Sequence, residues 1–319
     1  MRQFCTSIDS SRLFKGLALY QSLTRHAPGS VLWVLCLDRA TERVLGALPL
    51  PGLRALSLAE LEAAEPRLRV LKPDRSRVEY GFTCIPALLW YLLTHVPEAA
   101  PITHLDADVY FFANPAPVLE DAGLGSIAIT PRRLPASRGD LAKRGSYNAS
   151  WVTFMDDRAG RECLAWWRNR CFEWCYDRLE DGKYAHLKYL DDWPTRFEGV
   201  HVLAHPGAGV GPWNVAAHPV SLGGRGLRVG GVPLVFYQFR GFERVTRWLF
   251  DLGLVHCGAR MTAILRDDVY LPYLAELRGI EHELRREIAG LPNGWRRSGG
   301  PGLGGLIQHA IRRELLVGR

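Results

Sequence analysis

Apolar residues along the first two hundred positions follow two alternating patterns. Continuous apolar runs bounded by polar residues are typical of strands buried on both faces, and apolar residues three or four positions apart are typical of helices. The runs predict strands at residues 2–7, 31–37, 53–58, 101–112, 126–130, 149–155 and 200–204. The helical spacings predict helices at residues 13–26, 57–64, 82–96 and 161–180. This alternation predicts an α/β fold with a parallel-rich sheet covered by helices on both faces.

The pattern changes near residue 250. Residues 261–291 have the spacing of helices, residues 298–305 are rich in glycine and predict a flexible hinge, and residues 306–316 predict a short basic amphipathic helix. We therefore expect a main domain at residues 1–250 and a helical C-terminal extension at residues 251–319. Two interpretations of the last helix stay open: it docks on the protein, or it lies on an anionic membrane surface as a peripheral contact.

The composition excludes several classes of protein. Hydrophobic residues make up 47% and charged residues 23% of the 319-residue chain, which is typical of a globular protein. No apolar run approaches the ~18 residues that a membrane span requires. The first residues lack the apolar stretch of a signal peptide, and the seven cysteines contain no Cys-x-x-Cys pair. We therefore expect a cytoplasmic protein with reduced cysteines.

The charge balance indicates small anionic ligands. Forty Lys and Arg residues against 33 Asp and Glu residues give a formal net charge of +7. A nucleic-acid-binding protein gathers its basic residues on one face, and here only Arg132-Arg133 and Arg296-Arg297 stand together. The excess is better suited to phosphorylated ligands or an anionic membrane surface, so no nucleic-acid partner is expected.

The most informative motif is Asp106-Ala107-Asp108, which follows an apolar run. Side chains two positions apart on a strand point to the same face, so both carboxylates are expected to converge. Like charges so close together need a proton or a cation between them. At the strand end, where α/β proteins bind their ligands, this pair predicts a Mg²⁺ or Mn²⁺ site that is completed by substrate phosphates.

A second motif follows the strand expected at residues 200–204. His205 stands next to a glycine-rich loop that contains Gly207 and Gly209. Imidazole binds Mn²⁺-like ions, and glycines let backbone N–H groups approach a diphosphate. The loop also has the glycine spacing of a dinucleotide fingerprint, but that fingerprint must open a helix, and here Pro212 follows instead.

Taken together, the motifs resemble GT-A-fold glycosyltransferases of the nucleotide-diphospho-sugar transferase superfamily, close to the bacterial enzymes of glycosyltransferase family 8. The segments that carry the resemblance run in the family's order and span about residues 1–245: residues 4–7, 104–115, 147–150, 188–194 and 205–214. The resemblance implies a GT-A fold, with a Rossmann-like mixed sheet flanked by helices. It also implies a hexosyltransferase that retains the configuration of the sugar, of the kind used in bacterial polysaccharide biosynthesis.

The resemblance assigns roles position by position. It implies metal ligation by Asp106, Asp108 and His205, and binding of the nucleotide-sugar by Thr6, Ser7, Asp9, Arg77, Tyr80, Asp106, Gly207 and Gly209. It places Asn148 near the donor sugar or the acceptor. The implied ligands are Mn²⁺ or Mg²⁺, a nucleoside diphosphate sugar (a UDP-sugar as the expected donor) and a carbohydrate or lipid-linked acceptor.

Two positions depart from the family's pattern. Related sequences carry Gly-Asp-Gln before the Lys-Tyr-Leu-Asp run, whereas this chain has Ala185-His186-Leu187. Either His186, Asp191 or Asp192 takes over the catalytic role of the missing acid, the donor differs, or activity is lost. Gln238 stands where a histidine is expected.

Two alternative functions therefore stay open beside the transferase. The departure at His186 and Leu187 fits a catalytically inactive module that binds nucleotide-sugars. A sugar nucleotidyltransferase shares the paired acids but needs a basic glycine-rich loop after the first strand, which this chain does not have. A dehydrogenase would leave Asp106 and Asp108 without a role.

Overall fold

The chain folds around a seven-stranded mixed sheet. The computed structural model describes residues 2–96, 99–224, 226–254, 257–295 and 315–317. Four neighbouring strands are parallel, and the next strand, β7, is antiparallel to the strand on either side of it. In spatial order the strands are β3 (Leu53–Ser57), β2 (Val31–Cys36), β1 (Gln3–Ile8), β4 (Ile102–Leu105), β7 (Tyr147–Phe154), β6 (Ile127–Pro131) and β8 (Val200–Val202).

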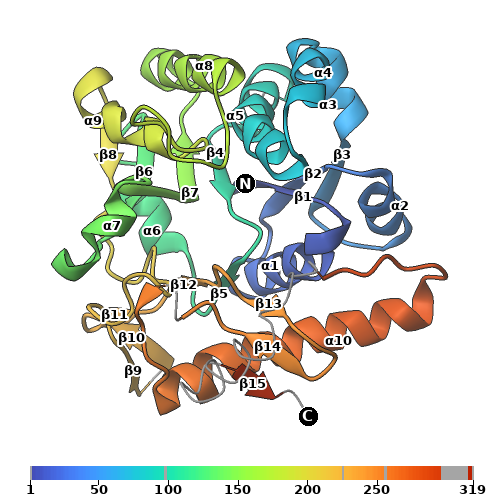
Figure 1. Cartoon of the computed structure of the whole chain (residues 1–319), viewed down its shortest axis with the longest axis vertical. Coiled ribbons are helices and arrows are strands. Elements are labelled where there is room, and N and C mark those ends of the chain that lie inside the picture. The colour runs from blue at the N-terminus through green and yellow to red at the C-terminus, as the bar shows by residue number, and fades with distance from the viewer. Residues whose placement is uncertain (1, 97–98, 225, 255–256, 296–314, 318–319) are drawn as a thin grey trace.

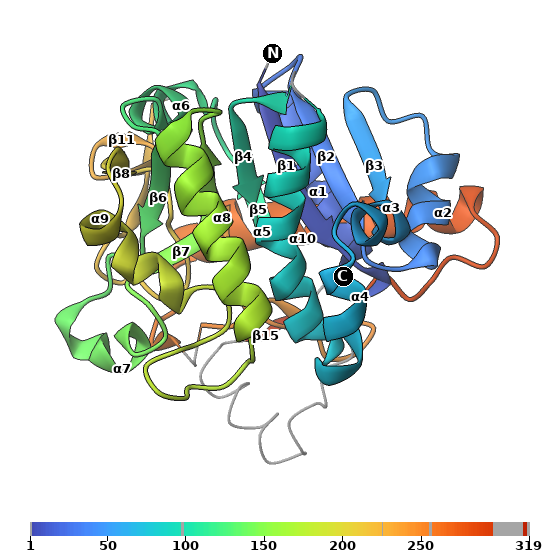
Figure 2. The ribbon, with the colours of Figure 1, turned by 90° about the horizontal axis from the view of Figure 1, so that it is seen from above.

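Helices cover both faces of this sheet (Figure 2). Helices α5 and α8 lie side by side over one face, while α1 lies on the other face with α10 packed against it. The longer helices are α1 (Leu13–His26), α2 (Arg39–Ala47), α5 (Arg77–His95), α8 (Arg158–Glu173) and α10 (Leu271–Glu287). The shorter ones are α3 (Leu58–Ala64), α4 (Arg67–Leu71), α6 (Ala116–Ala122), α7 (Gly139–Ala142) and α9 (Trp193–Arg196), with single turns such as η1 (Ser10–Arg12) and η5 (Lys188–Asp192) between them.

Strand alternation divides the buried residues into two cores. Successive side chains of a strand point to opposite faces, so neighbours in β1 join different cores. Phe4 packs with Phe14 of α1 and with Trp151, whereas Cys5 packs with Leu88 of α5. Both faces are apolar, which explains why the sequence shows continuous rather than alternating apolar runs here.

The strand expected at residues 101–112 is divided in two. Strand β4 ends at Leu105, the chain turns at residues 106–108, and β5 (Val109–Phe111) leaves the main sheet to pair with β12 (Phe236–Gln238). The backbone N–H of Val109 donates to the carbonyl of Asp106 at 3.1 Å and closes the turn. The two aspartates therefore lie in a turn at the edge of the parallel strands, not within one strand.

Two helix boundaries differ from those expected. Helix α5 begins at Arg77 instead of residue 82 because Ser76 and Glu79 form a capping box at its start. Helix α8 ends at Glu173 instead of residue 180. The buried guanidinium of Arg75 donates to the carbonyls of Cys171, Phe172 and Cys175, which satisfies the last turn of α8 and ends the helix there.

Residues 265–287 of the C-terminal region form a continuous helical segment, and its buried side chains share the core of the main domain. A π-helical turn (Leu265–Tyr270) leads into α10, and Figure 1 shows α10 on the far side of α1 from α5. Tyr273 of α10 stacks on Phe239 with ring centroids 3.7 Å apart. No helix in the described part of the chain is long and apolar enough to span a membrane.

Small sheets complete the fold on the same side. They are β9 (Val220–Gly223) with β10 (Gly226–Val229) and β11 (Val232–Pro233), and β13 (Glu243–Arg244) with β14 (Leu249–Asp251) and β15 (Leu315–Val317). The expected helix at residues 306–316 is therefore wrong at its end, because residues 315–317 pair as a strand with β14. The rest of that segment and the expected hinge at residues 298–305 lie outside the described residues.

Candidate active site

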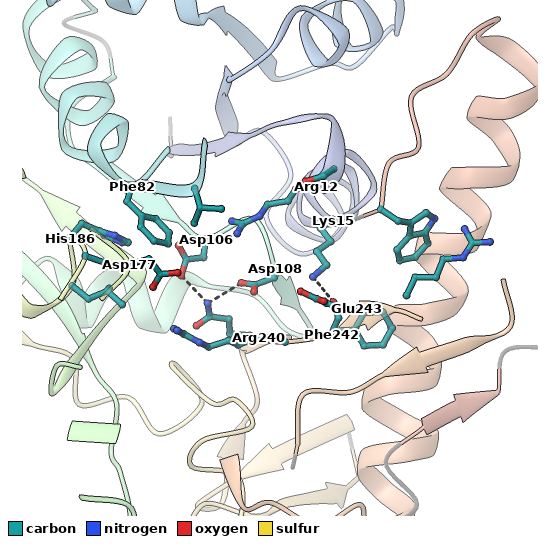
Figure 3. Close-up of a pocket in the computed structure, with 18 of the residues that line it drawn as sticks. Arg12, Lys15, Phe82, Asp106, Asp108, Asp177, His186, Arg240, Phe242 and Glu243 are labelled. Atoms are coloured by element: carbon teal, nitrogen blue, oxygen red, sulfur yellow. Dashed lines mark hydrogen bonds between the residues drawn. The ribbon is translucent and has the colours of Figure 1, made fainter. Parts of the chain in front are cut away.

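Two adjoining cavities open where β1 and β4 end. The narrow cavity, with a volume of about 60 Å³, is lined by the end of β1, by the residues that follow it and by one side of α5. The wide cavity, with a volume of about 260 Å³, extends from Asp106 and Asp108 toward Gln238 and Arg240 (Figure 3). Arg12, Phe82 and Asp106 line both cavities, so the two form one cleft at the sheet edge where α/β proteins bind ligands.

An amide holds the two carboxylates together. Gln238 Nε2 donates to Asp106 Oδ2 at 2.8 Å and to Asp108 Oδ1 at 2.9 Å, as the dashed lines in Figure 3 show. The Gln238 Oε1 atom accepts from Asn148 Nδ2 at 2.7 Å, which fixes the orientation of the amide. Burial and the neighbouring Asp108 carboxylate raise the pKa of Asp106 to about 6, against the opposing charges of Arg12 and Arg240.

This donor set fits a hard divalent cation. Oxygens of both carboxylates lie within hydrogen-bonding distance of one NH₂ group, so their lone pairs converge on a single point. Mg²⁺ and Mn²⁺ prefer such carboxylate oxygens and fill their remaining positions with water and phosphate oxygens. Among the described residues no group of three or more His, Cys, Asp and Glu side chains surrounds this point, so Asp106 and Asp108 are the only two such side chains that would hold the ion.

The narrow cavity contains most of the residues that were expected to bind the nucleotide. Thr6, Ser7, Asp9 and Arg77 all line it. Arg77 is fixed by ion pairs with Asp9, at 3.1 Å, and with Asp38. The buried hydroxyl of Thr6 has no hydrogen-bond partner among the described residues. A buried polar atom that faces a cavity without a partner is the kind of group that a ligand satisfies.

Comparison with known proteins identifies relatives of the chain. No protein-family model matches it. The uncharacterized protein YfnF of Bacillus subtilis is 33% identical over 251 residues, which cover 76% of this chain and 82% of YfnF. The chain belongs to the YfnF family. A second uncharacterized protein of the same bacterium, YfnD, is 27% identical over 92% of this chain and 94% of YfnD.

The solved structures identify the fold of this YfnF-family chain. The galactosyltransferase LgtC, in complex with donor and acceptor sugar analogues, superposes with a TM-score of 0.52 over 90% of this chain and 100% of LgtC. The sequence identity is 14%, so the likeness concerns the fold. The expected GT-A fold is thereby confirmed.

His205 does not join the carboxylates in this member of the YfnF family. Its backbone N–H donates to Asp121 of α6 at 2.9 Å, and its ring Nδ1 accepts from the N–H of Gly207 at 3.2 Å. Strand β8, which leads to His205, lies three strands from β4, and three strand spacings amount to about 14 Å. The expected three-residue metal site is therefore wrong in its third member, and Gln238 is the side chain that contacts both aspartates.

The glycines of the loop that follows His205 pack against neighbouring residues and do not line the cleft. A Cβ atom on Gly207 would lie 2.0 Å from the carbonyl oxygen of Pro233, and one on Gly209 would lie 2.4 Å from Thr130 Cγ2. Neither glycine is among the residues that line the two cavities. Their close backbone approach serves internal packing, so the structure does not support the predicted contact with a diphosphate.

A side chain in place of a glycine of this loop is therefore expected to destabilise the protein. Gly207→Ala is expected to reduce the free energy of unfolding by about 2 kcal/mol, because the new methyl group overlaps a backbone oxygen that cannot rotate away. Urea denaturation measures the change. Gly279→Ala in α10 is the control: no atom lies within 4 Å of the added Cβ, so this variant is expected to gain stability. Equal stability of Gly207→Ala and the wild type would contradict the packing role.

The remaining expected residues of the YfnF-family chain divide into two groups. Asn148 supports Gln238, and His186 lines the wide cavity. Tyr80 points away from the cleft and donates to Glu62 at 2.8 Å, because it lies on the opposite side of α5 from the cavity-lining Val78 and Phe82. Tyr80, Gly207 and Gly209, which were predicted to bind the nucleotide-sugar, are thus not among the residues that line the two cavities.

Asp191 and Asp192 also lie outside the lining of both cavities. Asp191 accepts from the N–H of Ser146 at 2.7 Å and from Lys188 Nζ at 2.6 Å, and Asp192 is exposed at the start of α9. Both sit on η5, which follows the His186 loop, and the half-buried carboxylate of Asp191 is paired with Lys188. The described geometry therefore offers neither carboxylate to a ligand in the cleft.

Sequence reasoning missed two cations of the cleft. Arg12 and Arg240 line the wide cavity, and their charges act on Asp106. Arg12 stands shortly after the first expected strand, and Arg240 stands two positions after Gln238. Their positions beside these motifs are a signal in the sequence, although many other arginines of the chain lie on the surface.

Proposed function

We propose that this chain is a glycosyltransferase that moves a sugar from a nucleoside diphosphate sugar, a UDP-sugar in the first instance, to a carbohydrate or lipid-linked acceptor. The observation that carries the proposal is the pair of carboxylates joined by Gln238 at the open edge of a GT-A fold. Two carboxylates at a cleft favour a bound divalent cation, and such a cation completes its coordination with the phosphate oxygens of a substrate. A diphosphate is therefore the ligand that fits beside them. Retention of the sugar configuration, as in the similar family 8 enzymes, belongs to the same proposal.

The cleft residues divide the work of transfer among them. Asp106 and Asp108 would hold Mn²⁺ or Mg²⁺, which supplies positive charge for the departing diphosphate. Arg12 and Arg240 lie beside the same carboxylates, where their guanidinium groups would donate to the phosphate oxygens as negative charge grows on the leaving group. Asn148 keeps the Gln238 amide oriented, so that the carboxylates stay in place between turnovers. The nucleoside would lie in the narrow cavity, against Thr6 and Ser7.

A panel titration tests this proposal. We expect one donor out of a set of UDP- and GDP-sugars to bind in the presence of Mn²⁺, and the binding to disappear when EDTA removes the ion. The reason is that the diphosphate and the two carboxylates repel one another without a cation between them. Isothermal titration calorimetry measures the binding, and release of the nucleoside diphosphate measures turnover. Binding that EDTA leaves unchanged would contradict the metal site, and the absence of any binding would contradict the transferase.

One observation favours a second candidate function, a module that binds nucleotide-sugars without turnover. The family's acid and amide are replaced by His186 and Leu187, and the described geometry brings neither Asp191 nor Asp192 into the cleft in their place. The same experiment separates the two functions, because the module predicts metal-dependent binding of a donor with no release of nucleoside diphosphate in the presence of any acceptor.

A further inference from the structure

His186 lines the wide cavity, and the nitrogens of its buried ring are unsatisfied. It stands in the loop between α8 and η5, its side chain lies beside Phe82 (Figure 3), and only 3% of the residue is exposed. Neither Nδ1 nor Nε2 has a hydrogen-bond partner among the described residues. Buried polar side chains are almost always hydrogen-bonded, so a buried ring with two free nitrogens at a cavity wall points to a ligand.

The surrounding structure fixes this ring. The ring of Phe82 lies 4.7 Å from the imidazole at an angle of 41°, and Trp167 Nε1 donates to the carbonyl of His186 at 2.9 Å. The preceding residue, Ala185, has a φ of 45°, a left-handed conformation that is rare for a residue with a side chain. Strained backbone of this kind persists where a side chain must be held in one position, and it is concentrated at binding sites.

The imidazole is held in its neutral form. Burial, together with the positive charges of Arg12 and Arg240 and the nearby His104, lowers the pKa of His186 to about 3. A neutral imidazole has one nitrogen that donates and one that accepts. The chemical group that matches it is a hydroxyl or an amide, which also donates and accepts, and not an anionic phosphate. Beside it, Ala185 and Leu187 add apolar surface to the same wall.

The order of nucleoside, diphosphate and sugar along the cleft would bring the sugar to this wall. Phe82 and Asp106 line both cavities, and Asp108 lines the wide cavity beside them. A nucleoside in the narrow cavity and a diphosphate at the carboxylates leave the sugar of the donor as the part that extends into the wide cavity. This step rests on the proposed function. We propose that His186 and Phe82 form the donor-sugar subsite, in which the imidazole hydrogen-bonds a hydroxyl or amide of an uncharged sugar and Phe82 packs against its C–H face.

The test compares a nucleotide with its sugar conjugates. Affinities for UDP, UDP-glucose, UDP-galactose, UDP-N-acetylglucosamine and UDP-glucuronic acid are measured with Mn²⁺ on the full chain. We expect one uncharged sugar conjugate to bind more tightly than UDP, and UDP-glucuronic acid to show no such gain. His186→Ala is expected to weaken binding of that conjugate at least tenfold and to leave binding of UDP within twofold of the wild type, because only the sugar contacts the imidazole.

Three further variants guard the interpretation. His186→Gln replaces His186→Ala as the test if the alanine variant folds poorly. The glutamine side chain can both donate and accept, so this variant is expected to retain part of the affinity for the conjugate. Phe82→Leu is expected to weaken the conjugate more than UDP, and His282→Ala on α10, outside the cleft, to change neither. Equal losses for UDP and its conjugate, or no loss for either, would overturn the subsite. A wild-type protein that binds UDP but no conjugate more tightly would also overturn it, whereas failure to bind any nucleotide would overturn the proposed function itself.

Discussion

Asp108→Asn is expected to reduce the rate of sugar transfer by about 10²–10³-fold. The substitution removes one of the two negative charges that would hold the cation, and groups that stabilise charge in a transition state contribute effects of about 10²–10³-fold each. It also places a second amide against the NH₂ group of Gln238, so the hydrogen bond at 2.9 Å is kept only where the new amide presents its oxygen to Gln238. Release of nucleoside diphosphate at saturating donor and Mn²⁺ measures the rate.

The matched control is another aspartate outside the cleft. Asp267 lies on the π-helical turn that precedes α10 and forms an exposed ion pair with Arg266 at 2.7 Å. Asp267→Asn is expected to retain the wild-type rate within about twofold, since exposed ion pairs contribute little to stability. Comparable rates for Asp108→Asn and Asp267→Asn would mean that the carboxylate pair takes no part in the reaction.

The second large effect concerns stability in acid. Burial lowers the pKa of His104 to about 4 and that of His186 to about 3, whereas both bind protons near pH 6.5 in the unfolded chain. Below pH 6.5 the unfolded state therefore binds more protons than the folded state, and the free energy of unfolding falls as the pH falls. Each histidine is expected to remove about 2 kcal/mol of stability between pH 6.5 and pH 4.5, because the slope reaches 1.36 kcal/mol per pH unit only once the unfolded imidazole is fully protonated.

Other groups titrate in the same interval, so the measurement is a difference between two proteins. Asp106 opposes the histidines, because its raised pKa of about 6 makes the folded state more stable as the pH falls. In His186→Gln the contribution of Asp106 to the pH dependence of stability is unchanged, and the contribution of His186 is absent. We expect the stability of the variant, relative to the wild type, to rise by about 2 kcal/mol between pH 6.5 and pH 4.5 in urea denaturation. A difference that does not vary with pH would show that His186 titrates normally in the folded protein.

The fold was predictable because its information is local. Apolar runs located the strands of the main sheet, and apolar residues three or four positions apart located α1 (Leu13–His26). The position of Asp106 and Asp108 at the end of a buried strand predicted a cleft there, and the structure places two cavities at that edge. Each of these predictions depends on a dozen neighbouring residues or fewer.

The partners of the carboxylates depend on contacts between distant segments. Gln238 reaches Asp106 and Asp108 because β12 pairs antiparallel to β5, with Gln238 opposite Val109. No local pattern shows which strands pair, so His205, which stands beside a glycine-rich loop, was the stronger prediction from sequence. The order of the strands then places His205 beside Asp121. Tyr80 failed for a related reason, since its motif gave a position along α5 but not the side of the helix that faces the cleft.

The stacking of Phe239 on Tyr273 has a consequence for the evolution and the engineering of this chain. Phe239 directly follows Gln238, which contacts Asp106 and Asp108, so the ring contact at 3.7 Å ties this segment to α10, which begins 32 residues after Phe239. A shortened gene that stops at residue 250 would remove that helix and leave an aromatic surface bare beside the cleft. Chimeras that exchange C-terminal regions between relatives should therefore exchange the segment around Phe239 as well, because the ring of Phe239 packs against α10.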